Sequence, residues 1–540
     1  KSYRHQIGST PLQYITLGEA LSNAAEKWLN IPAVISRQEN RTLTYSQLLE
    51  EADKLAVGLK DLGLSAGDRF GIWSPNCTQW VVAVMAAARS GIISVAMNPL
   101  YMSKDLKYCI NKVGMKAILA QENVKDDNYY KKLLNVIPEL ASSQPGKLES
   151  AEFKNLKSVI LKLLESVSRV NADDINRTIK SIHPDSGCNI QFTSGTTGYP
   201  KAPLLSHYNI VNNGYNIGRR NQLTEGHKTI CVQVPLFHVF GVVVTLSAAI
   251  QHGATLLFPS AKYSTTANVD AVIAEKCEII HGTPTMHIDL VNEIRARGIT
   301  NIKAELAVTG GSPVTPQLIN DLRQVLNVEK VNSVFGMTEG TAVSFQSMPG
   351  EDPERPLTYV GVLQDHLEAK IVDSNDNIVP YGTPGELITR GYSLMKTYWD
   401  DEAKTESIIT ADGWLRSGDQ MVLHEDGYGQ IVGRLKDLII RGGENIAPKE
   451  IEDIVSAHPD VMECQVFGIQ DDRLGEEVCA AVRLKEGIKF DAQKLQNHCL
   501  EHLAKFKTPK LFKSVDAFPK TASGKVQKYK LRNMVESGEL

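Results

Sequence analysis

Helix-like and strand-like patterns alternate along most of this 540-residue chain. Apolar side chains recur near the 3.6-residue helical period between residues 45 and 62, and residues 69–73 then form a short strand-like segment. Further strands are predicted at 116–120, 229–234, 254–258, 278–281, 305–309 and 330–335. Such alternation predicts an α/β fold in which helices cover mostly parallel sheets.

Two apolar stretches, 80–97 and 241–258, come close to the length that crosses a membrane. Arg89-Ser90-Gly91 interrupts the first, and Gln251-His252-Gly253 interrupts the second. Each stretch is therefore predicted to be a buried helix, a glycine just past its end, and a buried strand.

The length also predicts more than one domain, because single cores stop growing well below 540 residues. After about residue 356 glycines and prolines become frequent and the strand patterns shorten, which predicts a small β-barrel-like subdomain. A final region with both helix and strand patterns follows, which predicts an α+β unit. It has predicted helices at 448–457 and 491–504 and predicted strands near 461–468 and 477–485.

The composition is that of an ordinary globular protein. A net charge of −4 with 22% charged residues gives no basic footprint for nucleic acid. No two of the eight cysteines have C-x-x-C spacing, so the cysteines indicate neither a zinc site nor a disulfide framework, and reduced thiols are expected. The chain starts at Lys1, so we expect a leader to have been removed.

Residues 193–202, Thr-Ser-Gly-Thr-Thr-Gly-Tyr-Pro-Lys-Ala, carry the strongest chemical signal. They follow a strand-like segment at 188–192, and glycines there let backbone N–H groups approach a ligand closely. Together with hydroxyls and an ammonium group, these N–H groups can surround a phosphate chain. The spacing is not that of a Walker A loop, and runs of Gly, Ser and Thr also occur in plain flexible loops.

This loop resembles the pyrophosphate loop of the adenylate-forming superfamily, which includes acyl-CoA synthetases, luciferases and adenylation domains of peptide synthetases. Six more motifs of that superfamily follow in order: Phe-Gly-Met-Thr-Glu at 335–339, Tyr-Gly-Thr-Pro-Gly-Glu-Leu at 381–387, Asp-Gly-Trp-Leu-Arg-Ser-Gly-Asp at 412–419, Gly-Arg-Leu-Lys-Asp at 433–437, Arg-Gly-Gly-Glu-Asn-Ile at 441–446 and Pro-Lys-Thr-Ala-Ser-Gly-Lys at 519–525. The stretch 190–213 looks most like the medium-chain acyl-CoA synthetase family member 2 group.

The resemblance implies an N-terminal adenylation domain over residues 1–435, with subdomains of about 1–187, 188–355 and 356–435. It also implies a mobile C-terminal domain over 436–540, which turns about Lys436 between two half-reactions.

The implied activity is the AMP-forming ligation of a medium-chain fatty acid to coenzyme A. The substrates would be a small-molecule carboxylate, ATP and coenzyme A, with Mg²⁺ as the cofactor. Each step brings anionic oxygens together, so the protein must supply cations, N–H donors and a metal ion. A mitochondrial matrix address is implied by the resembling group, with the cytoplasm and the peroxisome as alternatives.

By resemblance, the triphosphate and adenosine are held by residues from four motifs. Thr338 would bind the α-phosphate, Glu339 would hold Mg²⁺, and Asp419 and Arg434 would bind the ribose hydroxyls. The full implied ATP-binding set is Thr193, Ser194, Gly195, Thr196, Thr197, Gly198, Lys201, Phe335, Asp419, Arg434 and Lys525.

Lys525 would bridge the carboxylate and the α-phosphate, and with Thr338, Glu339 and His238 it completes the implied catalytic set. His238 resembles a gate beside the acyl site. Gly442 and Gly443 resemble the path of the pantetheine arm of coenzyme A.

Two positions depart from the superfamily pattern. Ala202-Pro203 stands where a glycine usually follows the lysine, and Phe335 replaces a tyrosine, although its ring can still stack on adenine. Aryl-acid ligation, luciferase-type oxidation of an adenylate, and a nucleotide-binding pseudoenzyme remain open as alternatives, and the residues do not specify an acyl chain length.

Overall fold

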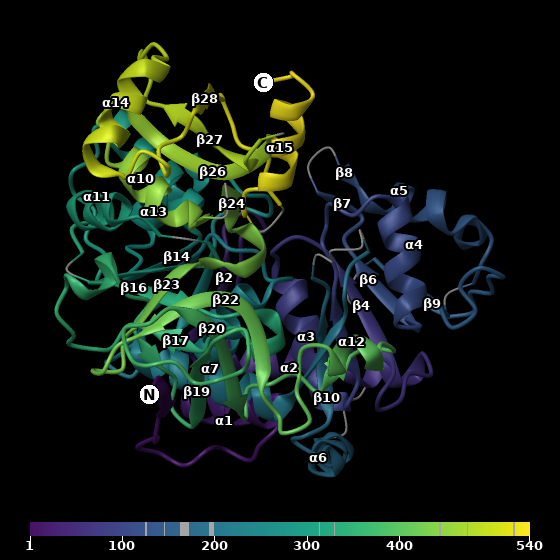
Figure 1. Cartoon of the computed structure of the whole chain (residues 1–540). Helices are drawn as coiled ribbons and strands as arrows, with labels where there is room; N and C mark the ends of the chain where they lie inside the picture. Colours follow the sequence, from purple (N-terminus) through teal and green to yellow (C-terminus); the bar gives the residue numbers. More distant parts are fainter. Residues whose placement is uncertain are drawn as a thin grey trace.

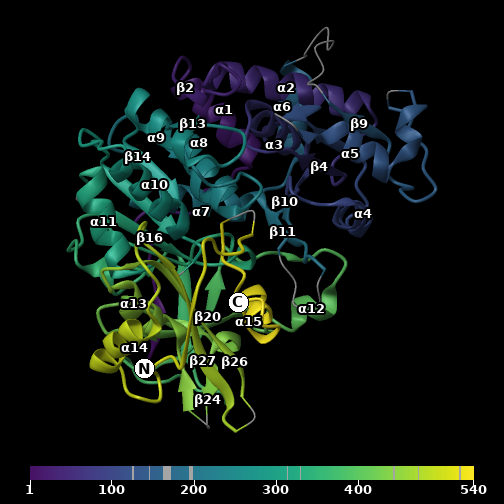
Figure 2. The ribbon, with the colours of Figure 1, turned by 90° about the horizontal axis from the view of Figure 1, so that it is seen from above.

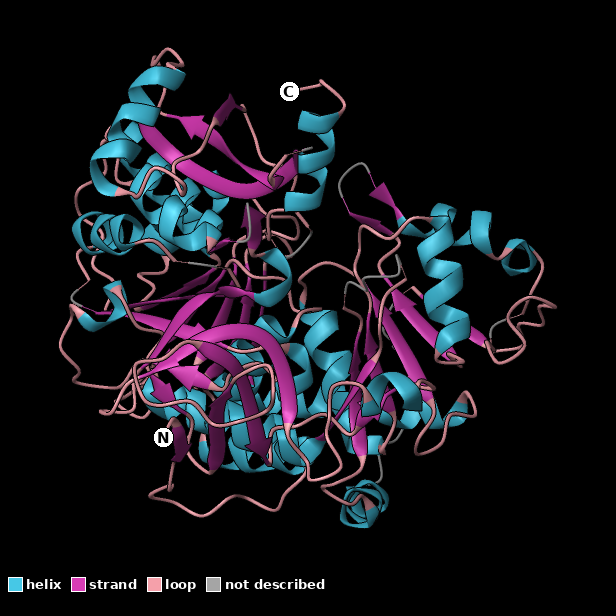
Figure 3. Cartoon of the chain, viewed as in Figure 1, coloured by secondary structure: helices cyan, strands magenta, loops and turns pink. Residues whose placement is uncertain are grey.

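The computed structural model describes residues 1–540 except 125, 126, 145, 162–171, 194–198, 313, 329, 442, 443, 472, 522 and 523. The described residues form two large sheets, a smaller antiparallel sheet, a two-stranded hairpin and a C-terminal α+β unit (Figure 1). Helices cover both faces of each large sheet, which confirms the predicted α/β class with mostly parallel sheets (Figure 3).

The first large sheet has the order β21-β11-β10-β5-β4-β6-β9. Its five strands from β10 to β9 run parallel, whereas β11 and β21 each pair antiparallel with a neighbour. The strands are β4 (Arg69–Trp73), β5 (Ile93–Ala96), β6 (Ala117–Ala120), β9 (Ser158–Ile160), β10 (Gly187–Gln191), β11 (Pro203–Ser206) and β21 (Thr397–Tyr398). No strand was predicted from the sequence at the position of β9.

The second large sheet has the order β18-β17-β16-β15-β14-β12-β13-β2-β3. The six strands from β16 to β2 run parallel, and antiparallel strands extend the sheet at both edges. The strands are β2 (Pro32–Ser36), β3 (Arg41–Thr44), β12 (Thr229–Val232), β13 (Thr255–Phe258), β14 (Ile279–Gly282), β15 (Leu306–Gly310), β16 (Lys330–Phe335), β17 (Phe345–Gln346) and β18 (Val362–Leu363).

One apolar core joins the two large sheets through a layer of helices. Phe70 of β4 and Val308 of β15 belong to this core together with residues of the helices between the sheets. These helices are α1 (Leu17–Lys27), α2 (Tyr45–Asp61), α3 (Thr78–Ser90), α7 (His207–Arg220), the π-helix η2 (Phe240–Ser247) and α8 (Ala248–His252).

Further helices cover the outer faces of the two sheets. The outer face of the first sheet packs on α4 (Ser103–Lys112) and α5 (Tyr129–Val136), and the outer face of the second packs on α9 (Thr265–Ala274), α10 (Pro284–Ala296) and α11 (Pro316–Leu326). The remaining elements of this part are the hairpin β7 (Asn123–Val124) and β8 (Asp127–Asn128), η1 (Pro138–Ala141), α6 (Ala172–Ser181), η3 (Thr338–Gly340), η4 (Arg355–Leu357) and α12 (Glu402–Glu406).

Both long apolar stretches fold as predicted. Helix α3 ends at Gly91, whose φ of 69° is left-handed, and the buried strand β5 follows. Helix α8 ends in the same way at Gly253, with φ of 74°, before strand β13. Among the described residues, no helix combines the length and the apolar content needed to cross a bilayer.

The smaller antiparallel sheet has the order β1-β19-β20-β22-β23 and encloses its own apolar core. Its strands are β1 (Tyr3–His5), β19 (Leu367–Val372), β20 (Gly385–Gly391), β22 (Leu415–Leu423) and β23 (Gly429–Arg434). This sheet is the predicted barrel-like part, and Figure 1 shows its strands curving in front of the helix layer.

The C-terminal unit has a sheet of five strands with a helical layer on each face. Two helices pack on one face and the last helix packs on the other. In Figure 2 the unit is drawn in front of β20 of the smaller antiparallel sheet. Its elements are η5 (Leu435–Asp437), β24 (Ile439–Arg441), β25 (Glu444–Ile446), α13 (Pro448–Ser456), β26 (Val461–Asp471), β27 (Gly475–Leu484), α14 (Ala492–His502), β28 (Leu511–Ser514) and α15 (Lys528–Glu536).

Polar contacts fix this unit against helix α10. Arg483 Nη2 donates to Asp289 Oδ1 at 3.0 Å, and Thr285 donates from its hydroxyl to Oε1 of Glu463 at 3.2 Å. Burial of Glu463 raises the pKa of its carboxyl group, and the nearby positive charges of Lys520 and Arg483 oppose that effect. These contacts hold the C-terminal unit against helix α10 and so determine which part of the main body its residues can contact.

Candidate active site

Loops from four neighbouring parallel strands converge at the carboxyl-terminal ends of the strands in the second large sheet. The loops after β12, β14, β15 and β16 contain His238, Thr283, Gly311 and Thr338, respectively. Because parallel strands end at the same edge, these residues gather where open α/β sheets bind ligands.

The C-terminal unit places Lys525 over this edge. A tight turn holds the lysine: the Thr521 N–H donates to the Lys525 carbonyl at 2.7 Å, and the Lys525 N–H donates to the Thr521 hydroxyl at 3.1 Å. Gly524 in this turn has φ of 84°, and a Cβ there would lie only 2.9 Å from Oγ1 of Thr283. A Cβ at Gly311 would lie 3.6 Å from Cε of Lys525, so the side chain reaches the ends of the strands.

The charge of Lys525 is balanced by groups from other parts of the chain. Burial lowers its pKa to about 8, and the positive charge of Arg434 acts in the same direction. The carboxylates of Asp419 and Glu339 oppose the shift and favour the ammonium form. An ammonium group at this position can neutralise the charge of a bound anion.

Asp419 and Arg434 form a pair on two adjacent strands. They are direct partners in the ladder between β22 and β23, and Arg434 Nε donates to Oδ1 of Asp419 at 3.0 Å. Asp419 is buried, and burial raises its pKa while Arg434 lowers it. The structure therefore brings this pair close to Lys525, although the two motifs are far apart in sequence.

Glu339 is buried in the short helix η3, directly after strand β16. Its Oε1 accepts a hydrogen bond from the hydroxyl of Tyr398, and Nζ of Lys201 lies 3.5 Å from that hydroxyl. Burial lowers the pKa of Lys201, whereas the Glu339 carboxylate opposes this shift. A buried carboxylate beside a lysine is a donor set that suits a hard cation together with phosphate oxygens.

The phosphate-loop motif is closed at its base. Thr193 and Lys201 exchange two backbone hydrogen bonds of 2.9 Å each, so both ends of the loop lie side by side. The buried Oγ1 of Thr193 has no hydrogen-bond partner among the described residues, which fits a ligand-facing hydroxyl. Five predicted loop residues lie outside the described residues: Ser194, Gly195, Thr196, Thr197 and Gly198.

The departure at Ala202-Pro203 is accommodated without loss of strand pairing. Pro203 is the first residue of β11, a position that tolerates proline. The pairing with the neighbouring edge strand uses the carbonyl of Ala202, which accepts from the N–H of Trp399 at 2.8 Å. The missing N–H of Pro203 is therefore not needed there.

Phe335 and His238 also lie at the carboxyl-terminal ends of these strands. Phe335 ends strand β16 and packs against the core of the antiparallel sheet, so its role in adenine stacking stays a prediction. Burial lowers the pKa of His238 to about 3, with the charge of Lys525 acting in the same direction, and its Nδ1 accepts from the N–H of Phe240. His238 is thus neutral at physiological pH.

The predicted hinge lies where the antiparallel sheet meets the C-terminal unit. Lys436 is exposed in helix η5, directly after β23. Its charge lowers the pKa values of both Lys201 and Lys525, so it lies near the other cations of the site. Gly442 and Gly443 lie outside the described residues.

Sequence reasoning did not identify Tyr398. This tyrosine is fully buried and connects Lys201 to Glu339 through its hydroxyl. The signal was weak, because Tyr398 lies 59 positions from Glu339 and 197 from Lys201 in the sequence. The pairing of β21 with β11 places Tyr398 near Lys201, and the Met395 N–H, which donates to the Glu339 carbonyl at 2.8 Å, ties the same segment to Glu339.

Family models match most of this fold. The model described as "AMP-binding enzyme" matches residues 21–399, and the model described as "AMP-binding enzyme C-terminal domain" matches residues 450–525. The two matched segments contain Thr193, Lys201, Thr338, Glu339 and Lys525.

Similar proteins match over nearly the whole length. The chain is 37% identical to the mitochondrial medium-chain acyl-CoA ligase ACSF2 of Danio rerio, over 99% of this chain and 91% of the relative. It is 39% identical to the protein of the same name in Bos taurus, over 96% and 88%. The crystal structure of the anthranilate CoA ligase AuaEII in complex with anthranoyl-AMP superimposes with a TM-score of 0.83 at 23% identity, covering 98% of this chain and 99% of that one.

Proposed function

The chain belongs to the AMP-binding enzyme family, and from this we propose that it is an acyl-CoA synthetase that joins a medium-chain fatty acid to coenzyme A. In the first step a carboxylate oxygen attacks the α-phosphate of ATP, giving an acyl adenylate and pyrophosphate. In the second step the thiolate of coenzyme A attacks the acyl carbon, and AMP leaves. The approach of the Lys525 side chain to the ends of the strands, where a Cβ at Gly311 would lie 3.6 Å from its Cε, is the observation that carries the proposal.

We assign the adenosine end of ATP to the paired strands β22 and β23. An ionised Asp419 accepts hydrogen bonds from both ribose hydroxyls, and Arg434 orients that carboxylate while adding a donor. Phe335 offers an aromatic face to adenine, a role that needs the ring more than a hydroxyl. The burial of Asp419 supports this assignment, because a buried carboxylate gains most from additional donors.

We assign the phosphates to the loop closed by Thr193 and Lys201 and to Thr338. The Thr193 hydroxyl, which has no hydrogen-bond partner among the described residues, and the Lys201 ammonium group supply donors. Residues 194–198, which complete the predicted set, lie outside the described residues. Glu339 would hold Mg²⁺, which when bound neutralises phosphate charge. The Tyr398 hydrogen bond fixes the Glu339 carboxylate in place for this task.

Lys525 is assigned to the first step. Its ammonium group would lie beside both the attacking carboxylate and the α-phosphate, where it lowers the repulsion between two anions. The turn at Gly524 supports this role, because it packs against Thr283 and so fixes the backbone of Lys525 at the ends of the strands. His238, neutral at physiological pH, can line the acyl side of the site without adding charge.

We further propose that the C-terminal unit turns about Lys436 for the second step, so that Gly442 and Gly443 line the path of the pantetheine arm. On this view residues 1–435 form the adenylation domain and residues 436–540 the mobile domain. The polar contacts of Arg483 and Glu463 with helix α10 support a docked first-step arrangement, because they hold the unit that carries Lys525 against the main body. The names of the relatives also support a mitochondrial location.

A series of carboxylates tests the substrate class. Straight-chain acids from acetate to palmitate, together with benzoate and anthranilate, are assayed for pyrophosphate release with ATP, Mg²⁺ and coenzyme A. We expect the highest kcat/KM near octanoate. A preference for the aromatic acids would replace the fatty-acid assignment with aryl-acid ligation, and ATP binding without product from any acid would favour a pseudoenzyme.

A further inference from the structure

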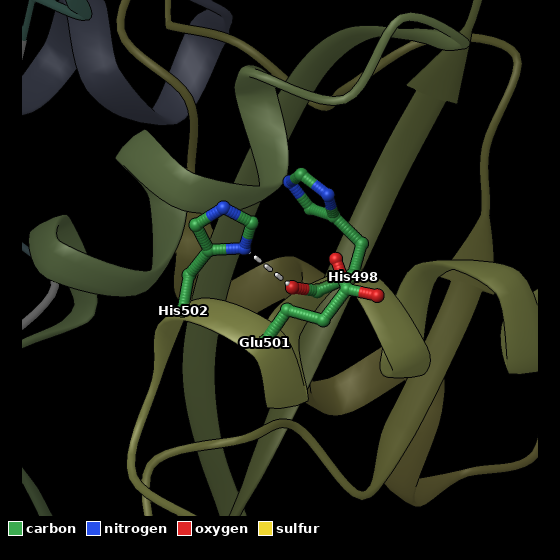
Figure 4. A group of neighbouring side chains, drawn as sticks. All are labelled: His498, Glu501 and His502. Atoms are coloured by element: carbon green, nitrogen blue, oxygen red, sulfur yellow. Dashed lines mark hydrogen bonds between the residues drawn. The ribbon is translucent and has the colours of Figure 1, made fainter.

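Two histidines and a glutamate form a compact group at the end of helix α14, outside the residues assigned to ATP and the acid (Figure 4). His498, Glu501 and His502 each offer one ligand atom, and these atoms all lie within 4.8 Å of one another. His498 lies three and four residues before Glu501 and His502, so the helix places its side chain beside both of theirs. Glu501 and His502 are exposed, whereas His498 is half-buried.

Hydrogen bonds to backbone carbonyls fix both imidazole rings. Nε2 of His498 lies 3.0 Å from the carbonyl oxygen of Ile454, and Nδ1 of His502 lies 2.9 Å from the carbonyl oxygen of His498. A carbonyl oxygen only accepts, so these two nitrogens carry the protons. The lone pairs of neutral His498 and His502 therefore lie on Nδ1 and Nε2, respectively. Histidines that bind metals are usually held in this way.

We propose that His498, Glu501 and His502 bind a divalent transition-metal ion such as Zn²⁺. Two neutral imidazoles and one carboxylate suit Zn²⁺, Co²⁺, Ni²⁺ or Cu²⁺, whereas Mg²⁺ prefers oxygen ligands and retained waters. The spacing His-x-x-Glu-His over 498–502 also occurs on the metal-binding helix of one class of zinc peptidases. Three protein ligands leave a coordination position open for water.

The surroundings favour a bound cation. The group lies on the last turn of α14, where the helix dipole is negative. The ring of His458 packs against His498 with its edge, at 5.1 Å between ring centroids, and supports it from the side of the core. All eight cysteines are buried, so no thiolate on the surface competes for the ion.

Titration of the full-length protein with ZnCl₂, followed by calorimetry, tests the proposal. We expect one Zn²⁺ per chain at this site, and MgCl₂ at the same concentrations should neither bind there nor displace it. Glu501→Gln and His502→Ala should each weaken Zn²⁺ binding at least about tenfold, the loss that even an outer-shell change causes. Both side chains are exposed, so circular dichroism of the variants should match that of the unchanged protein.

Two further variants locate the ion. His183 is an exposed histidine beside Asp185 and Tyr14, so His183→Ala is the matched control and should bind Zn²⁺ like the unchanged protein. Glu339→Gln removes the carboxylate assigned to Mg²⁺ and should leave the Zn²⁺ site on α14 intact, which separates this inference from the proposed function. Zn²⁺ binding that Glu501→Gln and His502→Ala leave unchanged, or no binding at all, would overturn the proposal.

Discussion

The hydroxyl group of Tyr398 donates a hydrogen bond to Oε1 of Glu339, and this contact joins an edge strand of the first large sheet to the end of a central strand of the second. The carboxylate assigned to the metal ion is therefore oriented by a residue from another sheet. Nζ of Lys201, at the base of the loop that we assign to the phosphates, lies 3.5 Å from the same hydroxyl.

We expect Tyr398→Phe to lower kcat/KM for ATP about 10- to 100-fold, because a hydrogen bond to a charged group contributes about 1.5–3 kcal/mol. The requirement for Mg²⁺ should rise at the same time, as measured by magnesium titration of the initial rate. Tyr381→Phe is the matched control, since its hydroxyl bonds the carbonyl of Tyr3 at the surface. An equal loss of kcat/KM in both variants would contradict the positioning role of Tyr398.

Lys525→Ala should slow acyl-adenylate formation about 10²- to 10³-fold, the usual cost of losing a group that stabilises charge in the transition state. Thioester formation from a supplied acyl adenylate should change much less, because that step needs no neutralisation of the entering carboxylate. Lys530→Ala removes an exposed lysine of the same segment and serves as the control. Equal losses in both half-reactions would contradict the assigned role.

The rate of adenylation should depend on pH through Lys525. Its lowered pKa of about 8 means that the ammonium form, which neutralises the reacting anions, is lost as the pH rises through 8. We expect kcat/KM of the first half-reaction to fall about tenfold per pH unit well above this value. The profile is measured by pyrophosphate release. A rate that stays flat from pH 7 to pH 10 would be incompatible with this assignment.

Asp419→Asn should raise KM for ATP about 10- to 100-fold, because the amide cannot accept from both ribose hydroxyls and leaves Arg434 without its charge partner. The effect should shrink for 2′,3′-dideoxy-ATP, which lacks those hydroxyls. Asp426→Asn, in an exposed pair with Arg355, provides a control that should leave KM unchanged.

Lys436→Pro should restrict the hinge, because proline biases the preceding Leu435 away from its helical backbone angles. We expect acyl-adenylate formation to persist while transfer to coenzyme A slows. Single-turnover assays of the two half-reactions measure this split. An undiminished overall rate would argue against a turn about this residue.

The elements that the sequence predicted best are those with complete local signals. The helix, glycine and strand of residues 80–97 follow from apolar runs and from Gly91, whose left-handed backbone ends helix α3. The motif residues Asp419 and Arg434 were predicted to bind the same ribose, and their direct pairing follows from the register of two neighbouring strands.

The contacts that the sequence missed depend on distant segments. Tyr398 reaches Glu339 only because β21 adds to the edge of the first sheet, and nothing within β21 itself indicates that partner. Strand β2, which lies near the start of the chain, likewise pairs with the distant strand β13. The histidine group on α14 had a readable signal, His-x-x-Glu-His, but the fixed orientation of its rings needs the carbonyl of Ile454.

The fate of the carboxylate oxygen tests the central claim most directly. The protein is incubated with ATP, Mg²⁺, coenzyme A and octanoate labelled with ¹⁸O in its carboxyl group. The masses of the products are then measured by mass spectrometry. Attack on the α-phosphate predicts that each AMP carries one ¹⁸O atom and forms in equal amount with octanoyl-CoA. AMP without label, or label found in pyrophosphate, would contradict an acyl adenylate as the intermediate.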